Sequence, residues 1–403
     1  MAQLNEKFEF EQDGKTYSLY NLPKGFVIKG DVNIWGEGLT ELPDLSEVIV
    51  EGTFDCRANE LTSLKGAPKE VCGNFCCNNN ELTTLKGAPQ KVGGDFDCTE
   101  NKLGNLEGAP LEVGGYFNCS GNKLTTLEGG PKTVGDYFDC ADNQLTSLTG
   151  APQTVGDYFY CANNKLTSLK GAPQEVGDGF DCDDNQLTSL EGAPQKIKGS
   201  FFCNNNQLTS LEGAPQEVDG IFSCHGNRLT TLENAPQKVT CNFDCCHNLL
   251  TTLDFAPQEV GGDFVCHDNQ LVSLEGAPQK VGGYFDCSNN KLTTLEGGPK
   301  EIGTYFCCEG NQQLTSLAKL PKMEESQVVV CDRVLAKKYD SSHTRFTIKK
   351  LHASPAYQNE AKIEELRQKK HQERVEKEQK ALKNTQAAFE AWLKKNGMNL
   401  PEK

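Results

Sequence analysis

Hydrophobic and polar residues alternate along most of this chain in a pattern that repeats every 21 residues. The copy that begins at Val176 is V-G-D-G-F-D-C-D-D-N-Q-L-T-S-L-E-G-A-P-Q-K. Its phenylalanine and cysteine are two residues apart, which is the period of a short, half-buried β-strand. Two leucines follow five and eight residues after the cysteine and can turn back into the same interior. The cysteine recurs without a slip at Cys56, Cys77, Cys98, Cys119, Cys140, Cys161, Cys182, Cys203, Cys224, Cys245, Cys266, Cys287 and Cys308.

This period predicts a stacked-repeat protein, because one copy, or rung, cannot bury its apolar residues alone. Phe180 and Cys182 are predicted to point into the stack, and Asp181 to point outward. The asparagine three residues after each cysteine, such as Asn185, is expected to hydrogen-bond the backbone of its own rung and of the next one. The proline of the Gly-Ala-Pro segment lacks an N–H group, so this segment is expected on the outside, away from any ladder.

The pattern F-x-C-x-x-N-x-L-T-x-L resembles the L-x-L-x-x-N-x-L core of leucine-rich repeats. The resemblance covers about residues 34–321, and the Gly-Ala-Pro segment is similar to the short repeats of bacterial and phage proteins. It implies a β-rich solenoid with a single parallel sheet of short strands. Phenylalanine and cysteine replace the leucines of that family, and a 21-residue unit leaves little room for a convex helix. We therefore expect a slim coil with extended or turn-like outer segments.

Both ends of the chain depart from the repeat and predict capping elements. Two alternating segments flank Asp13 and Gly14, which together are typical of a β-hairpin turn. A hairpin is expected at this end because an open solenoid would expose an unpaired strand edge. We predict four units from these changes of pattern: a capping hairpin over 1–33, the solenoid over 34–321, a C-terminal cap over 322–354 that includes Val329 and Cys331 as a last rung, and a charged α-helix with a tail over 355–403.

The C-terminal helix is predicted to begin after Ser354 as its N-cap, with Pro355 in the first turn. It is predicted to end near Asn396, before Gly397. Most of its length is charged. This composition indicates either a solvated helix whose last turns pack on another surface or a coiled coil with few heptad contacts. Its apolar residues near the end are Leu382, Phe389, Trp392 and Leu393.

The charge is unevenly distributed along the chain. The formal net charge is −16. Residues 322–403 carry 18 Lys and Arg against 12 Asp and Glu, so the preceding residues carry a net charge of −22. An acidic array repels phosphate, which argues against nucleic acid as a partner. Neither a signal peptide nor an apolar run of membrane-spanning length is recognisable, so we expect no membrane contact and a cytoplasmic location.

The 19 cysteines are interpreted mainly as a buried structural column. Rungs about 4.8 Å apart would bring neighbouring cysteines within reach of a disulfide, but parallel side chains give a poor Cβ geometry. We therefore expect a reduced ladder of thiols. Three cysteines outside the column, Cys76, Cys246 and Cys307, are expected to face solvent.

The outward strand positions are free to vary, so a binding site is expected there. Tyrosines lie three residues before the cysteine on consecutive rungs. Aspartates lie one residue before it on alternate rungs, and Tyr160 is at this position between two of them. Tyrosine beside aspartate on a concave sheet suits a protein or peptide rich in Lys and Arg. The alternative is that duplication copied a solvent face without a function. The predicted partner-binding residues are Tyr116, Tyr137, Tyr158, Tyr160, Asp97, Asp139 and Asp181.

A second candidate site lies one residue after the cysteine on three consecutive rungs. His225, Cys246 and His267 occupy these positions, and His247 lies beside them. Imidazole and thiolate are ligands of zinc-type ions, and rungs about 5 Å apart could bring them together. A spacing of 21 matches no zinc motif, so drift within a degenerate part of the repeat is the alternative explanation. The predicted metal ligands are His225, Cys246 and His267.

The sequence contains no recognisable phosphate loop, nucleophile elbow or carboxylate pair in an apolar pocket. We therefore expect no enzyme activity and no cofactor. The pattern favours a protein-interaction scaffold that binds a partner on the concave acidic and tyrosine-bearing face. Two alternatives stay open: a structural or surface component of a phage or bacterial envelope, with the solenoid as a spacer, and a delivered effector that acts on host proteins.

Overall fold

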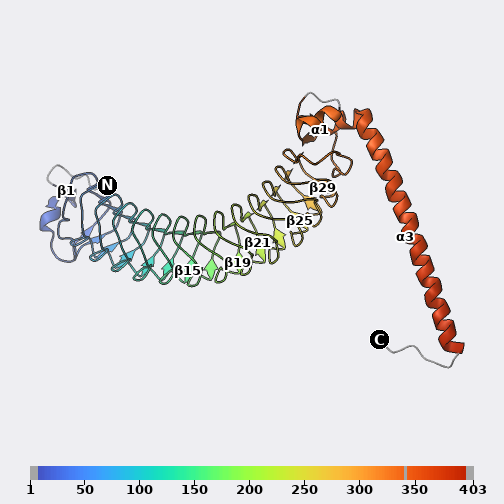
Figure 1. Cartoon of the computed structure of the whole chain (residues 1–403). Helices are drawn as coiled ribbons and strands as arrows, with labels where there is room; N and C mark the ends of the chain where they lie inside the picture. Colours follow the sequence, from blue (N-terminus) through green and yellow to red (C-terminus); the bar gives the residue numbers. More distant parts are fainter. Residues whose placement is uncertain (1–7, 340–342, 396–403) are drawn as a thin grey trace.

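Each 21-residue copy forms one rung of a curved solenoid, and successive rungs lie side by side along its length (Figure 1). The computed structural model describes residues 8–339 and 343–395, with side chains up to residue 383. The predicted β-rich solenoid, its N-terminal hairpin and its long C-terminal helix are confirmed.

The phenylalanine-containing segments pair in parallel and form a sheet of 16 strands along the solenoid. Because the 21-residue period is unbroken, successive phenylalanines such as Phe159 and Phe180 are register partners. The last strand pairs antiparallel with its neighbour and closes the C-terminal edge. The strands, in order from the N-terminal end, are β4 (Val32–Asn33), β6 (Phe54–Asp55), β8 (Phe75–Cys76), β10 (Phe96–Asp97), β12 (Phe117–Asn118), β14 (Phe138–Asp139), β16 (Phe159–Tyr160), β18 (Phe180–Asp181), β20 (Phe201–Phe202), β22 (Phe222–Ser223), β24 (Phe243–Asp244), β26 (Phe264–Val265), β28 (Phe285–Asp286), β30 (Tyr305–Cys307), β31 (Val328–Val330) and β32 (Arg345–Thr347).

The structure also contains a second line of short parallel strands, so the prediction of a single sheet was wrong. Each of these strands ends at the valine or isoleucine of the repeat. In complete copies it begins two residues after the proline; the strand Glu175–Val176, for example, follows Pro173. Proline does not interrupt the ladder, because the ladder begins beyond it. Val176 is buried, but a two-residue strand is too short to give a recognisable alternation. The strands are β3 (Val27–Ile28), β5 (Ile49–Val50), β7 (Glu70–Val71), β9 (Lys91–Val92), β11 (Glu112–Val113), β13 (Thr133–Val134), β15 (Thr154–Val155) and β17 (Glu175–Val176) in one sheet, and β19 (Lys196–Ile197), β21 (Glu217–Val218), β23 (Lys238–Val239), β25 (Glu259–Val260), β27 (Lys280–Val281) and β29 (Glu301–Ile302) in another.

The second line of strands is interrupted between β17 and β19. Most copies have a glycine directly after the valine, where the preceding rung leaves no room for a side chain. A Cβ atom added to Gly177 would lie 1.8 Å from the carbonyl oxygen of Gly156. Lys198 occupies this position in the next copy. Asp219 occupies it in the following copy, where β19 and β21 still pair, so the residue after the valine does not by itself explain the interruption.

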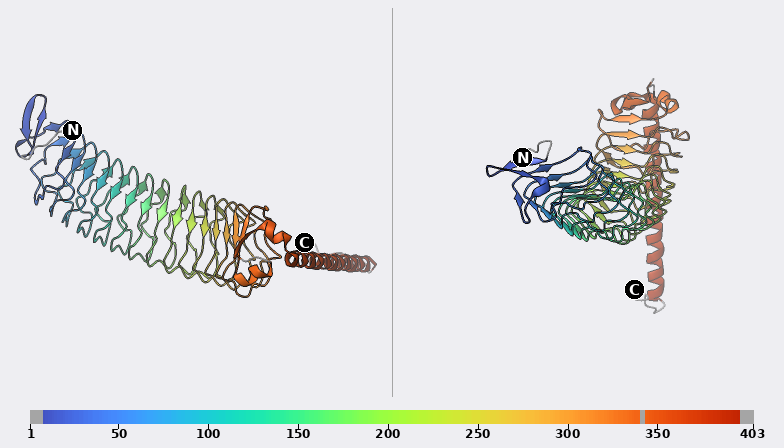
Figure 2. Two further views of the ribbon diagram at one scale, coloured as in Figure 1. Left: turned by 90° about the horizontal axis from the view of Figure 1, so that it is seen from above. Right: turned by 90° about the vertical axis from the view of Figure 1, so that its left-hand side faces the viewer.

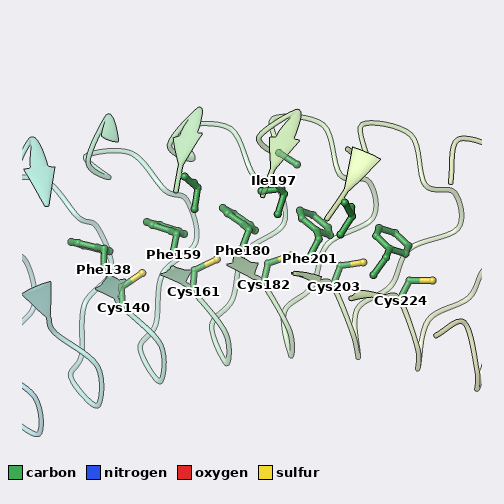
Figure 3. Close-up of a cluster of buried hydrophobic side chains, with 14 of the residues drawn as sticks. Phe138, Cys140, Phe159, Cys161, Phe180, Cys182, Ile197, Phe201, Cys203 and Cys224 are labelled. Carbon is green, nitrogen blue, oxygen red and sulfur yellow. The ribbon is translucent and has the colours of Figure 1, made fainter. Parts of the chain in front are cut away.

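The core contains a column of phenylalanine rings with a column of cysteines beside it (Figure 3). Two buried leucines from each complete copy belong to the same core. The ring centroids of Phe159 and Phe180 are 5.3 Å apart, and the ring planes differ by 17°. Phe180, Cys182, Leu187 and Leu190 are fully buried. Burial of one such ring stabilises the fold by roughly 1.5–3 kcal/mol. The predicted inward direction of phenylalanine and cysteine is confirmed.

The asparagine column joins each rung to the preceding one. The Nδ2 group of Asn185 donates to the carbonyl oxygen of Cys182 on its own rung at 3.2 Å and to that of Cys161 at 3.0 Å. Its Oδ1 accepts a hydrogen bond from the N–H group of Leu166 at 2.9 Å. The prediction that asparagine bridges two rungs is confirmed, although the second rung is the preceding one.

All 19 cysteines are free thiols. The thiol of Cys182 donates to the carbonyl oxygen of Phe202 on the next rung at 3.2 Å, and burial raises its pKa well above the usual value. The prediction that Cys246 faces solvent was wrong, since only 5% of this residue is exposed. The thiols that reach the surface are Cys72, Cys76, Cys241 and Cys307.

One rung has a strained residue in place of the glycine of Gly-Ala-Pro. Gly192 has a φ of +96° at this position, and a Cβ atom there would lie 2.8 Å from the carbonyl carbon of Leu169. Asn234 and Phe255 replace this glycine with φ values of 67° and 71°. Asparagine tolerates left-handed backbone, whereas phenylalanine does not. Since Phe255 is 57% exposed, burial does little to offset the strain.

The N-terminal end is closed by the predicted hairpin. β1 (Glu9–Gln12) pairs antiparallel with β2 (Lys15–Ser18) around Asp13 and Gly14, which both have positive φ. A short 3-10 helix, η1 (Leu19–Asn21), follows. The ring centroids of Phe10 and Phe26 are 6.3 Å apart, so the hairpin packs directly on the beginning of the solenoid.

The C-terminal end is closed by β31, β32 and two short helices, α1 (Arg333–Lys338) and α2 (Ile348–Ala353). Val329 and Cys331, which were predicted to form the last rung, are fully buried. From this end α3 (Pro355–Lys395) projects as a single long helix (Figure 2). No helix among the described residues combines the length and the apolar composition needed to cross a lipid bilayer.

The first turns of α3 contact the last part of the solenoid. Tyr339 and Ser316 donate hydrogen bonds to one carboxylate oxygen of Glu360 at 2.6 Å and 2.7 Å. Lys319 forms an ion pair with Glu364 at 2.7 Å. Beyond Glu364 most of the described side chains are exposed. The helix is therefore attached at its beginning and solvated along its middle.

Two predicted details of α3 have different outcomes. Ser354 precedes the helix as expected, but its buried hydroxyl oxygen has no hydrogen-bond partner among the described residues, so it makes no capping contact. Within the predicted apolar stripe, Leu382 is 71% exposed. The side chains of Phe389, Trp392 and Leu393 lie outside the described residues.

Replacing Phe255 by glycine is expected to increase the free energy of unfolding by about 1 kcal/mol. A non-glycine residue in left-handed backbone costs about 1–3 kcal/mol, and the larger chain entropy that glycine loses on folding offsets part of the gain. Urea denaturation measures the difference. Asn234→Gly is the matched control and should change stability much less, because asparagine already tolerates this backbone. A loss of stability in Phe255→Gly would show that contacts of the ring outweigh the strain.

Deleting residues 371–403 is expected to leave the unfolding temperature unchanged, whereas deleting 355–403 should lower it. The longer deletion removes Glu360 and Glu364, and hydrogen bonds to charged groups contribute roughly 1.5–3 kcal/mol each. Thermal unfolding followed by circular dichroism compares the two proteins. Equal unfolding temperatures would contradict a structural role for the first turns of α3.

Candidate functional site

Four tyrosine rings form one continuous array on the outward face of the 16-stranded sheet. The centroids of Tyr116 and Tyr137 are 4.6 Å apart in a stacked arrangement. Tyr160 meets Tyr137 edge to face at 6.1 Å and stacks on Tyr158 at 5.2 Å. All four residues are half-buried, so each keeps part of its surface open to solvent. The structure thus brings together the four tyrosines that the sequence singled out.

The repeat places these rings outward by strand alternation. A tyrosine directly precedes the phenylalanine that begins each of β12, β14 and β16; these tyrosines are Tyr116, Tyr137 and Tyr158. Since that phenylalanine points inward, its neighbour points outward. Tyr160 follows the phenylalanine of β16 and points outward for the same reason. The N–H group of Tyr116 also donates to Oδ1 of Asp95 on the preceding rung at 3.1 Å, which holds its backbone in place.

A second tyrosine pair lies towards the C-terminal end of the same repeat column. Tyr284 and Tyr305 stack with centroids 4.7 Å apart. The N–H group of Tyr284 donates to Oδ1 of Asp263 at 2.9 Å, as Tyr116 does to Asp95. This pair has the local structure of the first array but only two rings.

The three predicted aspartates belong to the local backbone structure as well as to the charged surface. The Oδ1 atoms of Asp97, Asp139 and Asp181 accept hydrogen bonds from the N–H groups two residues further on at 3.0, 2.9 and 2.9 Å. This contact defines an Asx turn. Asn118 makes the same contact at 3.0 Å from the same repeat position. The sequence analysis did not predict this turn. The asparagine at the same position on an intervening rung could have indicated it, because asparagine also forms this turn.

Partial burial makes these carboxylates weaker acids than usual. Burial raises the pKa of Asp97 and of Asp139. For Asp181, burial and then the charge of Asp183 raise the pKa to about 6. Burial also raises the pKa of Tyr160 to about 12, so its hydroxyl keeps its proton at neutral pH. The face therefore combines hydroxyl donors with at least one carboxylate whose charge changes near pH 6.

The outward residues after Cys245 and Cys266 form a cluster of metal-ligand types. One potential ligand atom from each of Cys246, His247 and His267 lies within 4.8 Å of the others. The rings of His247 and His267 meet edge to face with centroids 5.0 Å apart. His225, which the sequence analysis grouped with Cys246 and His267, is not part of this cluster in the described structure.

A carboxylate completes this cluster. The Oδ2 atom of Asp268 lies 2.6 Å from Nδ1 of His267 and 3.8 Å from Nε2 of His247. Asn289 donates a hydrogen bond to the same oxygen at 3.3 Å. Burial acts to raise the pKa of Asp268, but the hydrogen bonds from His267 and Asn289 outweigh it and hold the pKa below the usual value. The carboxylate is therefore ionised at neutral pH.

The sequence analysis placed His247 beside the cluster but not among its ligands, and it did not include Asp268, because it treated each strand as straight. Both residues have left-handed backbone, with φ values of 50° and 52°. They occupy the position directly before the column asparagine, which most rungs fill with Asn, Asp or Gly. These residue types tolerate left-handed backbone, so their recurrence was the available signal. The turn brings this position beside the outward residue that precedes it.

No family model and no curated protein matches the sequence. The structure is similar to that of YopM, a leucine-rich effector protein from Yersinia pestis, with a TM-score of 0.54 and 21% identity over 75% of this chain and 82% of YopM. Two further solved structures match less well. YopM from Yersinia enterocolitica has a TM-score of 0.39 and 16% identity over 75% of this chain and 86% of its own. The functional domain of InlJ from Listeria monocytogenes, which includes a cysteine ladder, has a TM-score of 0.38 and 18% identity over 75% of this chain and 68% of its own. The likeness to the first structure shows that this chain has a leucine-rich-repeat-like solenoid fold.

The contribution of Asp181 to stability is expected to fall as the pH rises from 3.8, its ordinary pKa, to about 6, its pKa in the folded protein. In this range the folded protein binds a proton that the unfolded chain has released, so a rising pH favours unfolding. Asp181→Asn removes this effect and keeps the turn acceptor, as Asn118 illustrates. At pH 7 the free energy of unfolding of the variant should exceed that of the wild type by roughly 1–3 kcal/mol. At pH 4 the two free energies should be closer. Urea denaturation at both pH values measures this, and an equal gain at both would exclude the buried charge as the cause.

Proposed function

We propose that this protein is a non-enzymatic scaffold that binds a protein or peptide rich in Lys and Arg on the outward face of the 16-stranded sheet. The observation that carries the proposal is the continuous array of Tyr116, Tyr137, Tyr160 and Tyr158 over three consecutive rungs. Repeat proteins of this shape commonly bind along such a surface.

The tyrosine array suits a binding surface because its rings are already ordered. Each ring stacks on a neighbour, as Tyr158 and Tyr160 do at 5.2 Å, so little rotamer freedom remains to be lost on binding. Tyrosine supplies both contact area and a hydroxyl donor. An arginine or lysine placed over such a ring gains about 0.5–2 kcal/mol from the cation–π interaction.

The aspartates supply the charge that complements a basic partner. Asp97, Asp139 and Asp181 lie on alternate rungs of the same face, and their turn contacts hold each carboxylate in one orientation. From Asp97 to Asp181 there are five rungs, which is about 19 Å at about 4.8 Å per rung. An extended segment of about six residues covers this length, so a short linear peptide could contact the whole face.

The delivered-effector alternative has one observation in its favour. YopM, which has a similar fold, is described as a leucine-rich effector protein. An effector would also need a surface for host proteins, and the tyrosine array would supply it. An envelope spacer, by contrast, would leave the tyrosine array without a role, so we favour the scaffold.

Tyr137→Ala and Tyr158→Ala are each expected to weaken binding by about 1–3 kcal/mol, because truncating a central aromatic contact residue has effects of this size. A random peptide library selected on the wild-type protein should first yield ligands enriched in Lys and Arg. Calorimetry with one such peptide then measures the loss, and the unfolding temperature should change little.

The matched control is the second tyrosine pair. Tyr284→Ala and Tyr305→Ala remove stacked rings from the same repeat column, and they should leave the affinity unchanged. Replacing Asp97, Asp139 and Asp181 by asparagine keeps the turn acceptors, so it should mainly slow association and reduce its salt dependence. Affinity that is insensitive to Tyr137 and Tyr158 but sensitive to the control pair would contradict the proposed site.

A further inference from the structure

Two neighbouring rungs each place two consecutive residues with potential ligand atoms at one point of the solenoid, where Cys246 is buried and His247 is exposed. Cys246 and His247 follow Cys245 on one rung, and His267 and Asp268 follow Cys266 on the next. The N–H group of His247 donates to the carbonyl oxygen of His267 at 3.0 Å. The backbone ladder therefore holds these two pairs side by side.

The spacing of the polar atoms approaches that of a tetrahedral metal site. The ligand atoms of Cys246, His247 and His267 all lie within 4.8 Å of one another. A tetrahedral zinc ion with Zn–S near 2.3 Å and Zn–N near 2.0–2.1 Å places one sulfur and two nitrogens about 3.3–3.6 Å apart. Rotation of the side chains would have to close the remaining difference of about 1 Å.

Asp268 determines which nitrogen of His267 is available. Its Oδ2 atom lies 2.6 Å from Nδ1 of His267. When the Nδ1–H group donates to this oxygen, Nε2 carries the lone pair and is free to bind a metal. Metal-bound histidines in proteins commonly donate their other N–H group to a carboxylate in this way. Asn289 holds the same carboxylate oxygen at 3.3 Å, which fixes the orientation of Asp268 in turn.

We propose that Cys246, His247 and His267 bind one Zn²⁺ ion, with Asp268 as the positioning residue of His267. A thiolate and two imidazoles are ligands suited to zinc and leave a fourth position for water or for a group of a partner. The ion joins two rungs of the solenoid at a surface four rungs away from the tyrosine array. This site is independent of the proposed partner site, since it shares no residue with it.

Titration of the metal-free, reduced protein with Co²⁺ tests the site directly. The wild type should bind one equivalent with a thiolate-to-cobalt charge-transfer band and the visible bands of tetrahedral cobalt, and one equivalent of Zn²⁺ should displace it. Cys246→Ser should abolish the charge-transfer band. His267→Ala should weaken Co²⁺ binding by roughly 100-fold or more, since it removes a direct ligand.

The positioning role of Asp268 has a separate signature. Asp268→Asn should retain the charge-transfer band, because the thiolate stays in place, while Co²⁺ affinity falls by about 10–100-fold. Asparagine also tolerates the left-handed backbone of this position. The unfolding temperature of this variant without metal should therefore match the wild type, which separates positioning from a loss of fold.

Two matched controls come from the same part of the solenoid. Cys241→Ser removes an exposed thiol, and His225→Ala removes a histidine one rung before Cys246. Both variants should bind Co²⁺ as the wild type does. Absence of a charge-transfer band in the wild type would overturn the proposal. So would binding that survives both Cys246→Ser and His267→Ala, because the bound ion would then be adventitious.

Discussion

Successive rungs approach so closely that most copies carry glycine at two points of the repeat, and the rest of the structure depends on this spacing. At Gly177 and Gly192 a Cβ atom would lie 1.8 Å and 2.8 Å from the backbone of the preceding rung. Between these points, Asn185 bonds the carbonyl oxygen of Cys161 one rung away. This bond and the pairing of the strands fix the register, so equivalent residues such as Phe159 and Phe180 are partners on neighbouring rungs.

Because equivalent positions lie over one another, a residue type that recurs at one position of the repeat forms a continuous line of side chains. Inside, it stacks phenylalanine rings; outside, it stacks Tyr116 on Tyr137 at 4.6 Å. The same spacing would bring like charges within about 4.8 Å if aspartate recurred on every rung. Asp97, Asp139 and Asp181 occur on alternate rungs, which doubles their separation. The alternation therefore eases repulsion in this column, whereas Asp136, Asp157 and Asp178 recur on consecutive rungs at another position of the repeat.

The inward columns could be predicted from the sequence because they follow a straight two-residue alternation, as Phe180 and Cys182 do. Features that depend on turns could not be predicted in this way. The strand Glu175–Val176 is too short to show a period, and left-handed backbone with a φ of 50° brings His247 beside the outward column. Alternation correctly predicts that Cys246 points away from the phenylalanine core. It does not predict that this residue is only 5% exposed, because exposure depends on the residues of neighbouring rungs as well.

The histidine and cysteine cluster lies where the solenoid carries its strained outer turn. Phe255, with a φ of 71°, belongs to the segment that leads from Cys246 and His247 on one rung to His267 on the next. In a repeat protein each rung contacts mainly its neighbours, so a local weakness is not shared over the whole stack. An ion bound across these two rungs would stabilise the stack at this point and leave the tyrosine array, four rungs or about 19 Å away, unchanged. Stabilisation of a strained segment therefore gives the proposed site a structural role that does not depend on partner binding.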